Sequence, residues 1–324
     1  MASHPCIPWG AHPVQPGSVN AGRLHADRSI LDTLRPPSEI EIHEGLVRAL
    51  IEQQCPEWAG ETLSFVDEGW DNVTWRLGRG HAVRIPRRHA AVELLRREQE
   101  WLPLLAPTLD VAVPLPLHRG VPGGGVPWIW SVVPWIEGLP AEREPLNPQG
   151  CGHLARILKA LHVSAPADAP PSDLRGVPLR SRADFMEARF GALEDRGHPD
   201  CRILRNLWSD GLAAPEATER VWLHGDLHPR NVLVRAGALS GIIDWGDITA
   251  GDPATDLAAA WMLAPEPVTR GRFWEEYRAA PALVRRARAW AVFFGVALTV
   301  SGDEGHEAMG RSVLSGVLSG EVEG

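Results

Sequence analysis

The sequence predicts an α+β protein with two lobes, and three features of the residue pattern support this. Short runs between residues 69 and 88 alternate apolar and polar side chains, which is typical of a β-hairpin. A long amphipathic helix follows at residues 90–107, and most of the second half shows helical periodicity. A connector near residues 133–138 separates the two halves. The expected divisions are a flexible tail at 1–38, a first lobe with a hinge at 39–136, and a second lobe at 137–324.

Composition and charge limit the class of protein. With 324 residues and 44% hydrophobic content, the chain can bury the core of a soluble globular protein. Its formal net charge of −9 argues against nucleic-acid binding, which needs a basic surface to displace the counterions of the phosphates. The same charge suits a cationic small substrate, although many soluble proteins are acidic for solubility alone.

The cysteines and the apolar segments indicate a cytoplasmic protein without membrane contact. A monomer and a homodimer are both open alternatives. The longest apolar run, Ala289–Val300, is shorter than the ~20 residues of a membrane span, so it predicts a buried helix. No secretory signal is visible. The four cysteines lack a Cys-x-x-Cys pair and predict neither a zinc site nor a disulfide framework (Cys6, Cys55, Cys151 and Cys201).

The first lobe is expected to begin with a helix at residues 39–55 and to continue with a β-hairpin. In the hairpin, Val73 to Leu77 alternate, Gly78-Arg79-Gly80 forms the turn, and His81 to Ile85 alternate again. Because successive side chains point to opposite faces of a strand, Arg84 lies on the face opposite its apolar neighbours.

The helix at residues 90–107 carries a carboxylate in an unexpected position. At ~100° per residue, Glu98 falls inside the apolar stripe of this helix, whereas Glu93 and Glu100 fall on the polar side. A buried carboxylate without a partner costs free energy, so the sequence predicts a cationic partner for Glu98.

Two further strands and a well-delimited helix follow. The strand candidates are residues 115–117 and 128–133. The helix begins with Asn147 as the N-cap and Pro148 at the first helical position, both favoured there. His162, at its end, is expected to be a packed structural histidine.

The stretch HGDLHPRNVLVRAGALSGIIDWGD, residues 224–247, concentrates polar side chains between two strand-like runs, 232–234 and 239–243. A plain hairpin with polar side chains is one interpretation, and a zinc site formed by His224, Asp226 and His228 is another.

The third interpretation of this stretch is phosphoryl transfer. That chemistry uses an aspartate that accepts the proton of the attacking hydroxyl, an asparagine five residues later on Mg²⁺, and a second aspartate beyond a hairpin. Asp226, Asn231 and Asp244 have that order and spacing.

The motifs HGDLHPRN, IIDWGD and GDPATDLA resemble those of the aminoglycoside phosphotransferase family, small-molecule kinases with the bilobal protein-kinase fold. The resemblance runs from about residue 63 to the C-terminal helices. It implies that Asp226 is the catalytic base, that Asn231 and Asp244 bind Mg²⁺, and that ATP or GTP is the phosphate donor. It also implies a hinge that receives the nucleotide base through backbone groups, at Val132, Val133 and Trp135.

The chain departs from the family pattern around the phosphates. Arg84 stands where the family commonly has a lysine. An ion pair between Arg84 and Glu98 would explain both the inward position of the carboxylate and the outward position of the arginine on its strand. The alternative is a surface arginine beside Arg87 and Arg88. The segment EGWDNVTW has one glycine instead of a glycine-rich loop, so Asn72 is expected to help there.

The second lobe lacks the features by which protein kinases respond to a phosphorylated activation segment. Gly225 replaces the arginine that reads a phosphorylated activation segment, and no such segment follows Asp247. Asp252 is expected to cap a helix opened by Pro253, and Asp256 to brace the catalytic loop, although a favourable helix-dipole contact would explain Asp256 as well. His224 and His228 are expected to support that loop.

We therefore expect an O-phosphotransferase that acts on an alcohol group of a small hydroxylated molecule. Residues 163–220 and the helices after Asp256 should form the acceptor pocket. Acidic side chains there could bind amino groups or could simply be solvated (Glu187, Glu194, Glu275, Glu276, Asp303 and Glu304). An aminoglycoside-like antibiotic is the first expectation, and a macrolide, suggested by RIPRR, or a metabolic sugar or amino alcohol are alternatives. A kinase-shaped protein that binds its ligand with little or no catalysis is a further alternative.

Overall fold

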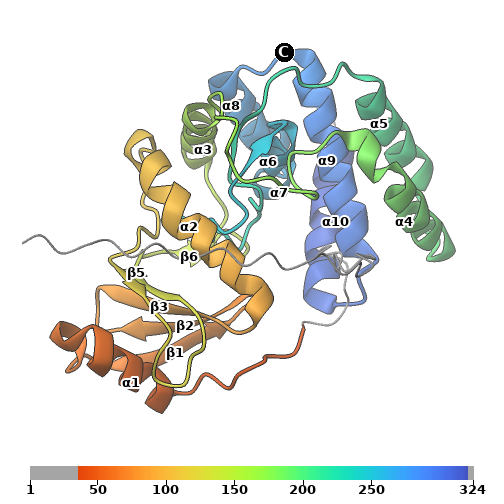
Figure 1. The fold of residues 1–324 in the computed structure, drawn as a ribbon. Helices are drawn as coiled ribbons and strands as arrows, with labels where there is room; N and C mark the ends of the chain where they lie inside the picture. Colours follow the sequence, from red (N-terminus) through yellow and green to blue (C-terminus); the bar gives the residue numbers. More distant parts are fainter. Residues whose placement is uncertain (1–35, 320–324) are drawn as a thin grey trace, which may run out of the picture.

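The computed structural model describes residues 36–319 as a bilobal α+β fold of the protein-kinase type (Figure 1). Of the predicted tail at residues 1–38, only residues 36–38 fall within the described part of the chain, and Cys6 lies outside it. The buried apolar residues form two clusters, one for each lobe. The predicted arrangement, a sheet with one key helix followed by a mostly helical lobe, is confirmed.

The first lobe is built on an antiparallel sheet whose strand order is β1-β2-β3-β5-β4. The predicted hairpin is confirmed, and its second strand places Arg84 opposite Thr74 on one side and Ser131 on the other. Its turn contains Gly78 with a φ of +58°, a conformation that favours glycine. The strands are β1 (Leu63–Glu68), β2 (Asn72–Leu77), β3 (His81–Pro86), β4 (His118–Gly120) and β5 (Trp130–Pro134).

The strand predicted at residues 115–117 is wrong by three positions, since β4 begins at His118. Pro114 and Pro116 lack the N–H that a ladder needs, so regular pairing begins after them. The Leu117 N–H already donates to the Val132 carbonyl at 2.8 Å, next to the start of the strand.

Within the described residues, the α-helices of the first lobe are α1 and α2. Helix α1 (Glu44–Gln54) confirms the predicted first helix but begins five residues later than expected, and it buries Val47, Leu50 and Ile51. Helix α2 (Val92–Leu105) runs diagonally from the sheet toward the second lobe (Figure 1). Because α2 spans the junction of the lobes, a side chain on its buried face can contact both.

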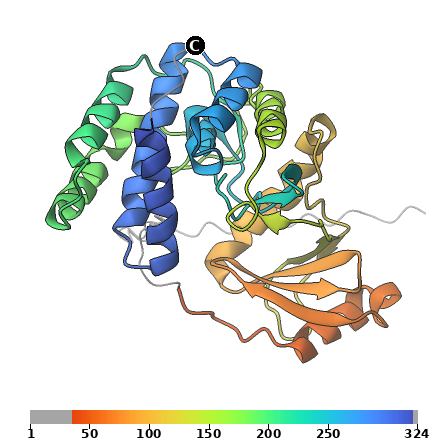
Figure 2. The same ribbon diagram turned by 180° about the vertical axis from the view of Figure 1, so that it is seen from behind.

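The second lobe combines short strands near the junction with helices farther out. The strands are β6 (Leu139–Pro140), β7 (Val221–Leu223), β8 (Val232–Arg235), β9 (Ala238–Ile242) and β10 (Thr249–Gly251). The helices are α3 (Pro148–Leu161), α4 (Ala183–Asp195), α5 (Cys201–Ala213), α6 (Ala254–Leu257), α7 (Ala259–Leu263), α8 (Pro267–Tyr277), α9 (Pro281–Thr299) and α10 (Glu304–Leu318). Both ribbon views place α4 and α5 on the outer edge, away from the sheet (Figure 2).

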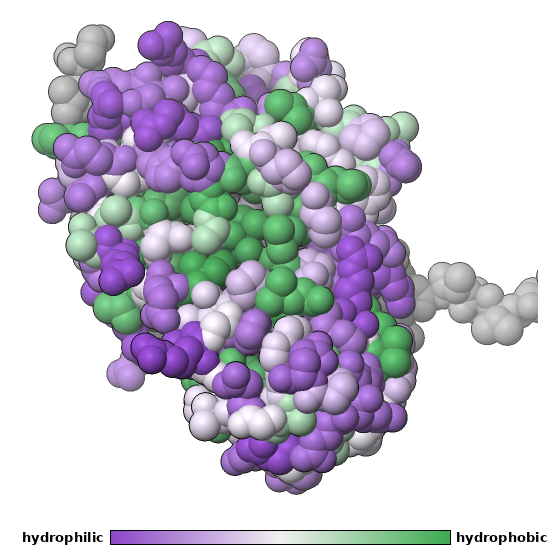
Figure 3. Space-filling view, turned by 90° about the vertical axis from the view of Figure 1, so that its left-hand side faces the viewer, coloured by the Kyte–Doolittle hydropathy of each residue, from purple (hydrophilic) through white to green (hydrophobic). Residues whose placement is uncertain are grey.

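The apolar run predicted as a buried helix lies in α9, which packs against α5 and α10 and buries every residue from Ala289 to Thr299. Among residues 36–319, no helix is long and apolar enough to cross a membrane. One side of the molecule shows hydrophobic residues across its middle and hydrophilic residues above and below (Figure 3). Helix α9 thus contributes many buried residues to the apolar cluster of the second lobe.

Two helix starts were predicted, those of α3 and α6. The start of α3 agrees with the prediction, and that of α6 does not. The Asn147 side chain accepts a hydrogen bond from the Gly150 N–H at 2.8 Å and caps α3, which begins at Pro148. Helix α6 begins at Ala254, so Pro253 is its N-cap and not its first residue. Asp252 still accepts from the Ala254 N–H at 3.0 Å, which satisfies one free donor of this helix end.

Candidate active site

An ion pair between the two main elements of the first lobe forms one side of the site. Arg84 of β3 contacts Glu98 of α2 through Nη1, and both side chains are buried, with Glu98 only 1% exposed. This contact confirms the predicted partner of Glu98 and excludes the alternative of a surface arginine. Nη2 of Arg84 donates to Oδ1 of Asp244 at 3.1 Å, so the arginine also reaches the second lobe.

The segment after β9 is held against α2. The Trp245 N–H donates to Oε2 of Glu98 at 3.0 Å, and the fully buried indole donates to the Ile242 carbonyl at 2.9 Å. A Cβ added at Gly246 would lie 2.9 Å from the Leu94 Cβ, so only glycine fits this close approach. Trp245 and Gly246 therefore fix the residue that precedes them, Asp244.

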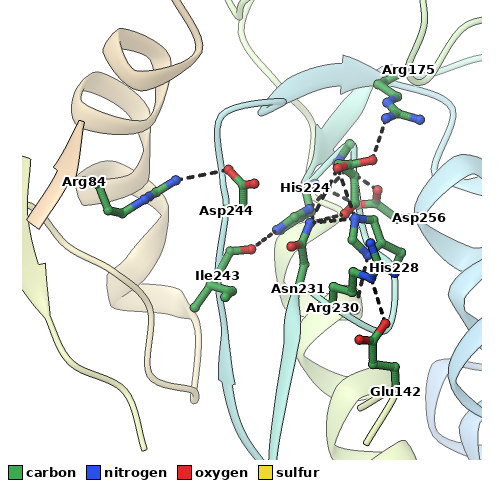
Figure 4. Close-up of polar contacts among 12 residues, drawn as sticks. Arg84, Glu142, Arg175, His224, His228, Arg230, Asn231, Ile243, Asp244 and Asp256 are labelled. Carbon is green, nitrogen blue, oxygen red and sulfur yellow. Dashed lines mark hydrogen bonds and ion pairs between the residues drawn. The ribbon is translucent and has the colours of Figure 1, made fainter. Parts of the chain in front are cut away.

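Asp244 is held in an unusual state. Its φ of +61° lies in the left-handed region, which aspartate tolerates better than most residues. Burial raises the pKa of Asp244 to about 7. The positive charge of Arg84 opposes this rise, and the negative charges of Glu98 and Asp71 add to it. Figure 4 shows Asp244 between Arg84 on the side of the first lobe and Asn231 on the other.

The loop that follows β7 carries Asp226 and Asn231. The Asn231 amide donates to the Asp226 carbonyl at 2.9 Å and lies 3.5 Å from its Oδ2, so the two side chains are neighbours. Nε2 of His228 lies 3.4 Å from the same Oδ2. Gly225 has a φ of +86°, and a Cβ there would lie 2.3 Å from the Asp247 carbonyl oxygen. The glycine in this motif is thus required by the backbone.

Asp256 braces this loop from α6, as predicted. Its carboxylate accepts from the His224 N–H at 2.8 Å and from the Gly225 N–H at 2.9 Å. His162 contacts the same carboxylate at 3.3 Å and the Tyr277 hydroxyl at 2.7 Å, which confirms a packed structural role for this histidine. The buried His224 ring pairs with the Ile243 carbonyl at 3.1 Å and so links the loop to the segment before Asp244.

The turn between β1 and β2 stands where the sequence predicts a phosphate-covering loop. The Gly69 N–H donates to the Asn72 carbonyl at 2.9 Å, and Arg88 pairs with Asp71 at 2.9 Å. Oδ1 of Asn72 is buried and accepts no hydrogen bond from any residue in 36–319. An unsatisfied buried acceptor at this turn points to a missing donor from a ligand or water.

The expected hinge residues are largely engaged within the sheet. Val132 and Val133 are buried in β5, and the Trp135 N–H donates to the Gly80 carbonyl at 2.8 Å. Because strand backbones alternate, the Pro134 carbonyl points away from β3.

Sequence reasoning did not select Arg175, which contacts Asp226 directly through Nη2 and Oδ1. Burial opposes the charge of Asp226, but Arg175, followed by His228 and His224, outweighs it and lowers the pKa of Asp226. Arg175 also lines a cavity of about 320 Å³ between residues 171–180 and 211–220. No motif marks this arginine, because its segment, SDLRGVPLR, is irregular and remote in sequence from Asp226.

The acidic side chains considered for binding amino groups are mostly engaged elsewhere. Glu187 and Glu194 pair with Arg205, while Glu275 and Glu276 pair with Arg272. Asp303 accepts from the His306 N–H at 2.8 Å and caps α10, and Glu304 lies exposed in the first turn of that helix. None of these residues lines the cavity beside Arg175.

This fold and this arrangement of residues agree with a known family of enzymes. Residues 62–291 match the model of the phosphotransferase enzyme family, so the chain belongs to that family. It is a small-molecule phosphotransferase, an enzyme class whose acceptor is an alcohol group.

Among its relatives, the viomycin phosphotransferase of Streptomyces vinaceus is 30% identical over 198 residues, which cover 56% of this chain and 67% of that protein. The GDP complex of aminoglycoside 2'-phosphotransferase-IIIa has a similar structure, with a TM-score of 0.62, 18% identity and coverage of 84% of this chain and 97% of that one. Macrolide 2'-phosphotransferase MphH from Brachybacterium faecium gives a TM-score of 0.53 at 23% identity, covering 78% of this chain and 92% of that one.

Proposed function

We propose that this enzyme transfers the γ-phosphate of ATP or GTP to a hydroxyl of an aminoglycoside-like or related antibiotic. The observation that carries the proposal is the meeting of Asp226, Asn231 and Asp244 beside an arginine that Glu98 holds in place. Kinases need a base, two metal ligands and a cation on the phosphates in one place, because catalysis of phosphoryl transfer is mainly positioning and charge stabilisation.

The first lobe is proposed to bind the nucleotide. Arg84 lies 3.1 Å from Asp244 and keeps its charge, since Glu98 and Asp244 raise its pKa although burial opposes this. It is therefore the residue that we assign to the phosphates, and the Nδ2 group of Asn72 would donate to a phosphate oxygen while its Oδ1, unpaired among residues 36–319, would accept from water. The base contacts belong to the backbone around Val133 and Trp135, at the Pro134 carbonyl.

The residues present fit Mg²⁺. Nδ2 of Asn231 donates to the Asp226 carbonyl, and Oδ1 makes no hydrogen bond with a residue in 36–319. Asp244 offers a second oxygen; burial is the main cause of its raised pKa, and Glu98, Asp71 and Asp226 add negative charge that a cation would offset. Oxygen ligands of this type are those that Mg²⁺ prefers. Bound there, Mg²⁺ would neutralise charge on the phosphates.

Asp226 is proposed to act on the acceptor. Its carboxylate orients the acceptor hydroxyl and accepts its proton as the new bond between that oxygen and the γ-phosphorus forms. The bond from the γ-phosphorus to the bridging oxygen breaks, and the nucleoside diphosphate leaves. His224, His228 and Asp256 support the loop through the contacts described above.

The acceptor is proposed to bind on the side of the second lobe, where residues 171–180 and 211–220 enclose the cavity beside Arg175. The relatives that phosphorylate viomycin and aminoglycosides favour a polar antibiotic. The structural similarity to a macrolide phosphotransferase supports a macrolide as the second candidate.

A direct assay tests the proposal. The protein with Mg²⁺ and ATP or GTP is incubated with kanamycin, viomycin, erythromycin, glucose or homoserine, and nucleoside diphosphate release is measured. Acceptor-dependent release that Asp226→Ala abolishes, without a loss of nucleotide affinity, is expected. Ligand binding without release would instead identify a binding protein of kinase shape, and full turnover by Asp226→Ala would refute the assigned base.

A further inference from the structure

Arg175 is the closest side-chain partner of Asp226. Its Nη2 contacts Oδ1 of Asp226, whereas the contacts to Oδ2 are longer, 3.4 Å from His228 and 3.5 Å from Asn231. Arg175 is 9% exposed, so this ion pair is shielded from water and is stronger than a surface pair would be. The direction of the Asp226 carboxylate thus depends mainly on Arg175.

The backbone that carries Arg175 is fixed to the same frame as the catalytic loop. The Gly176 N–H donates to Oγ1 of Thr255 at 3.1 Å, and the Gly176 carbonyl accepts from the Asp252 N–H at 2.9 Å. Thr255 adjoins Asp256, which holds the loop of Asp226 through two backbone N–H groups. Helix α6 therefore sets the positions of both partners of the ion pair.

Gly176 itself makes this attachment possible. Its φ is +65°, and a Cβ there would lie 2.9 Å from the Gly251 Cα and 2.5 Å from Cδ1 of Leu223. The segment therefore lies directly on β7 and β10 at a position where only glycine fits.

The guanidinium group is also restrained. Its central carbon lies 5.8 Å from the ring centroid of Phe294, within the range of a cation–π contact. Nε is buried without a hydrogen-bond partner among residues 36–319, whereas Nη2 contacts the Asp226 carboxylate directly, and Asp247 and Asp256 add negative charge around the group. The Phe294 ring and the Asp226 carboxylate together restrict the guanidinium group to one main orientation.

We infer that Arg175 is a positioning residue for the phosphoryl transfer: it aims the Asp226 carboxylate at the acceptor hydroxyl from outside the family motifs. The inference rests on the proposed function, in which Asp226 is the base. A base that is displaced by about 1 Å loses about 10²-fold in rate. Removal of Arg175 should therefore act on turnover and not on nucleotide binding.

The test compares Arg175→Met, Arg175→Lys and the control Arg285→Met, with the best acceptor of the panel above. Arg285 also pairs with an aspartate, Asp210, but on the exposed surface between α5 and α9. We expect Arg175→Met to lower kcat about 10²-fold, with the Kd of the nucleotide unchanged within about twofold, and Arg175→Lys to recover part of the loss. The control should keep the kcat of the wild type.

A double-mutant cycle with Asp226→Asn separates positioning from a general structural role. If Arg175 acts through Asp226, Arg175→Met should lower kcat much less in the Asp226→Asn background than in the wild type. If Arg175→Met does not fold, Arg175→Gln, which is shorter than arginine and uncharged but keeps a polar N–H group, takes its place in the cycle.

An unchanged or increased kcat in Arg175→Met, or additive losses in the cycle, would overturn the inference while the proposed function stands. A wild-type protein that releases no diphosphate with any acceptor would overturn the proposed function, and the inference with it.

Discussion

The carboxylate of Glu98 binds both lobes at once: one oxygen contacts Arg84, and the other accepts the Trp245 N–H at 3.0 Å. Through this one buried side chain, helix α2 holds two parts of the site in place. They are Arg84, the cation assigned to the phosphates, and the segment that carries Asp244. This arrangement explains why a charged residue lies in the apolar stripe of α2. It also makes Glu98 a direct link between the two lobes.

Glu98→Gln should impair both stability and turnover. It removes the charge opposite Arg84 and leaves a buried guanidinium with only Asp244, so we expect a loss of about 3 kcal/mol in the free energy of unfolding. We expect kcat to fall at least ~10-fold, because Arg84 and Asp244 are no longer held together. Urea unfolding and the diphosphate assay measure the two effects. Glu93→Gln, on the exposed face of α2, is the control and should change neither.

Gly246→Ala should push α2 away from the second lobe. The added methyl would lie 2.9 Å from the Leu94 Cβ, closer than side chains pack, and we expect a destabilisation of about 1–3 kcal/mol together with slower turnover. Gly191→Ala in α4 is the matched control. A Cβ there meets nothing within 4 Å, so this change should stabilise the protein by about 0.5–1 kcal/mol. Equal thermal stability of the two variants would contradict the predicted close contact.

Asp256→Asn should destabilise the protein in a way that depends on pH. Burial opposes ionisation of Asp256, but His162, His224 and the Gly225 N–H outweigh it and lower the pKa of this carboxyl. Such a group stabilises the folded protein above the ordinary pKa of aspartate, about 4, and this contribution disappears as the pH falls below it. Asparagine leaves one buried backbone N–H without an acceptor, which costs about 1–3 kcal/mol.

The measurement is urea unfolding of the wild type and Asp256→Asn between pH 3 and 7. The difference in stability should be constant from about pH 5 upward and should shrink below about pH 4. Asp195→Asn on the exposed end of α4 is the control. A difference that grows as the pH falls would show that the sign of the pKa shift is wrong.

Asp244→Asn should raise the Mg²⁺ concentration that activity requires. The variant loses the negative charge of one proposed ligand while the shape of the side chain is kept, so we expect an increase of at least ~10-fold in the concentration for half-maximal rate. EDTA should abolish the activity of the wild type, and added Mg²⁺ should restore it. Asp110→Asn, far more exposed, should leave the Mg²⁺ requirement as it is. An unchanged requirement in Asp244→Asn would remove this residue from the metal site.

The local pattern of the sequence determined the elements and the family. Alternation predicted the hairpin of β2 and β3, and helical spacing predicted α1 and α2, because these periods depend only on neighbouring residues. A continuous apolar run predicted the buried helix in α9. The position of Glu98 within an apolar stripe predicted a buried partner, and the resemblance to the phosphotransferase family pointed to Arg84. The motif around Asp226 and Asn231 is compact enough to be recognised without coordinates.

Only the tertiary structure decided which distant residues meet. Arg175 reaches Asp226 from an irregular segment 51 residues earlier in the chain, and no periodicity or motif marks such a contact. The strand predicted at residues 115–117 moved to β4 because pairing partners, not local alternation, decide where a ladder starts. Local sequence fixes backbone preferences, whereas long-range contacts arise when the whole chain buries its apolar surface, and the site between the lobes forms only then.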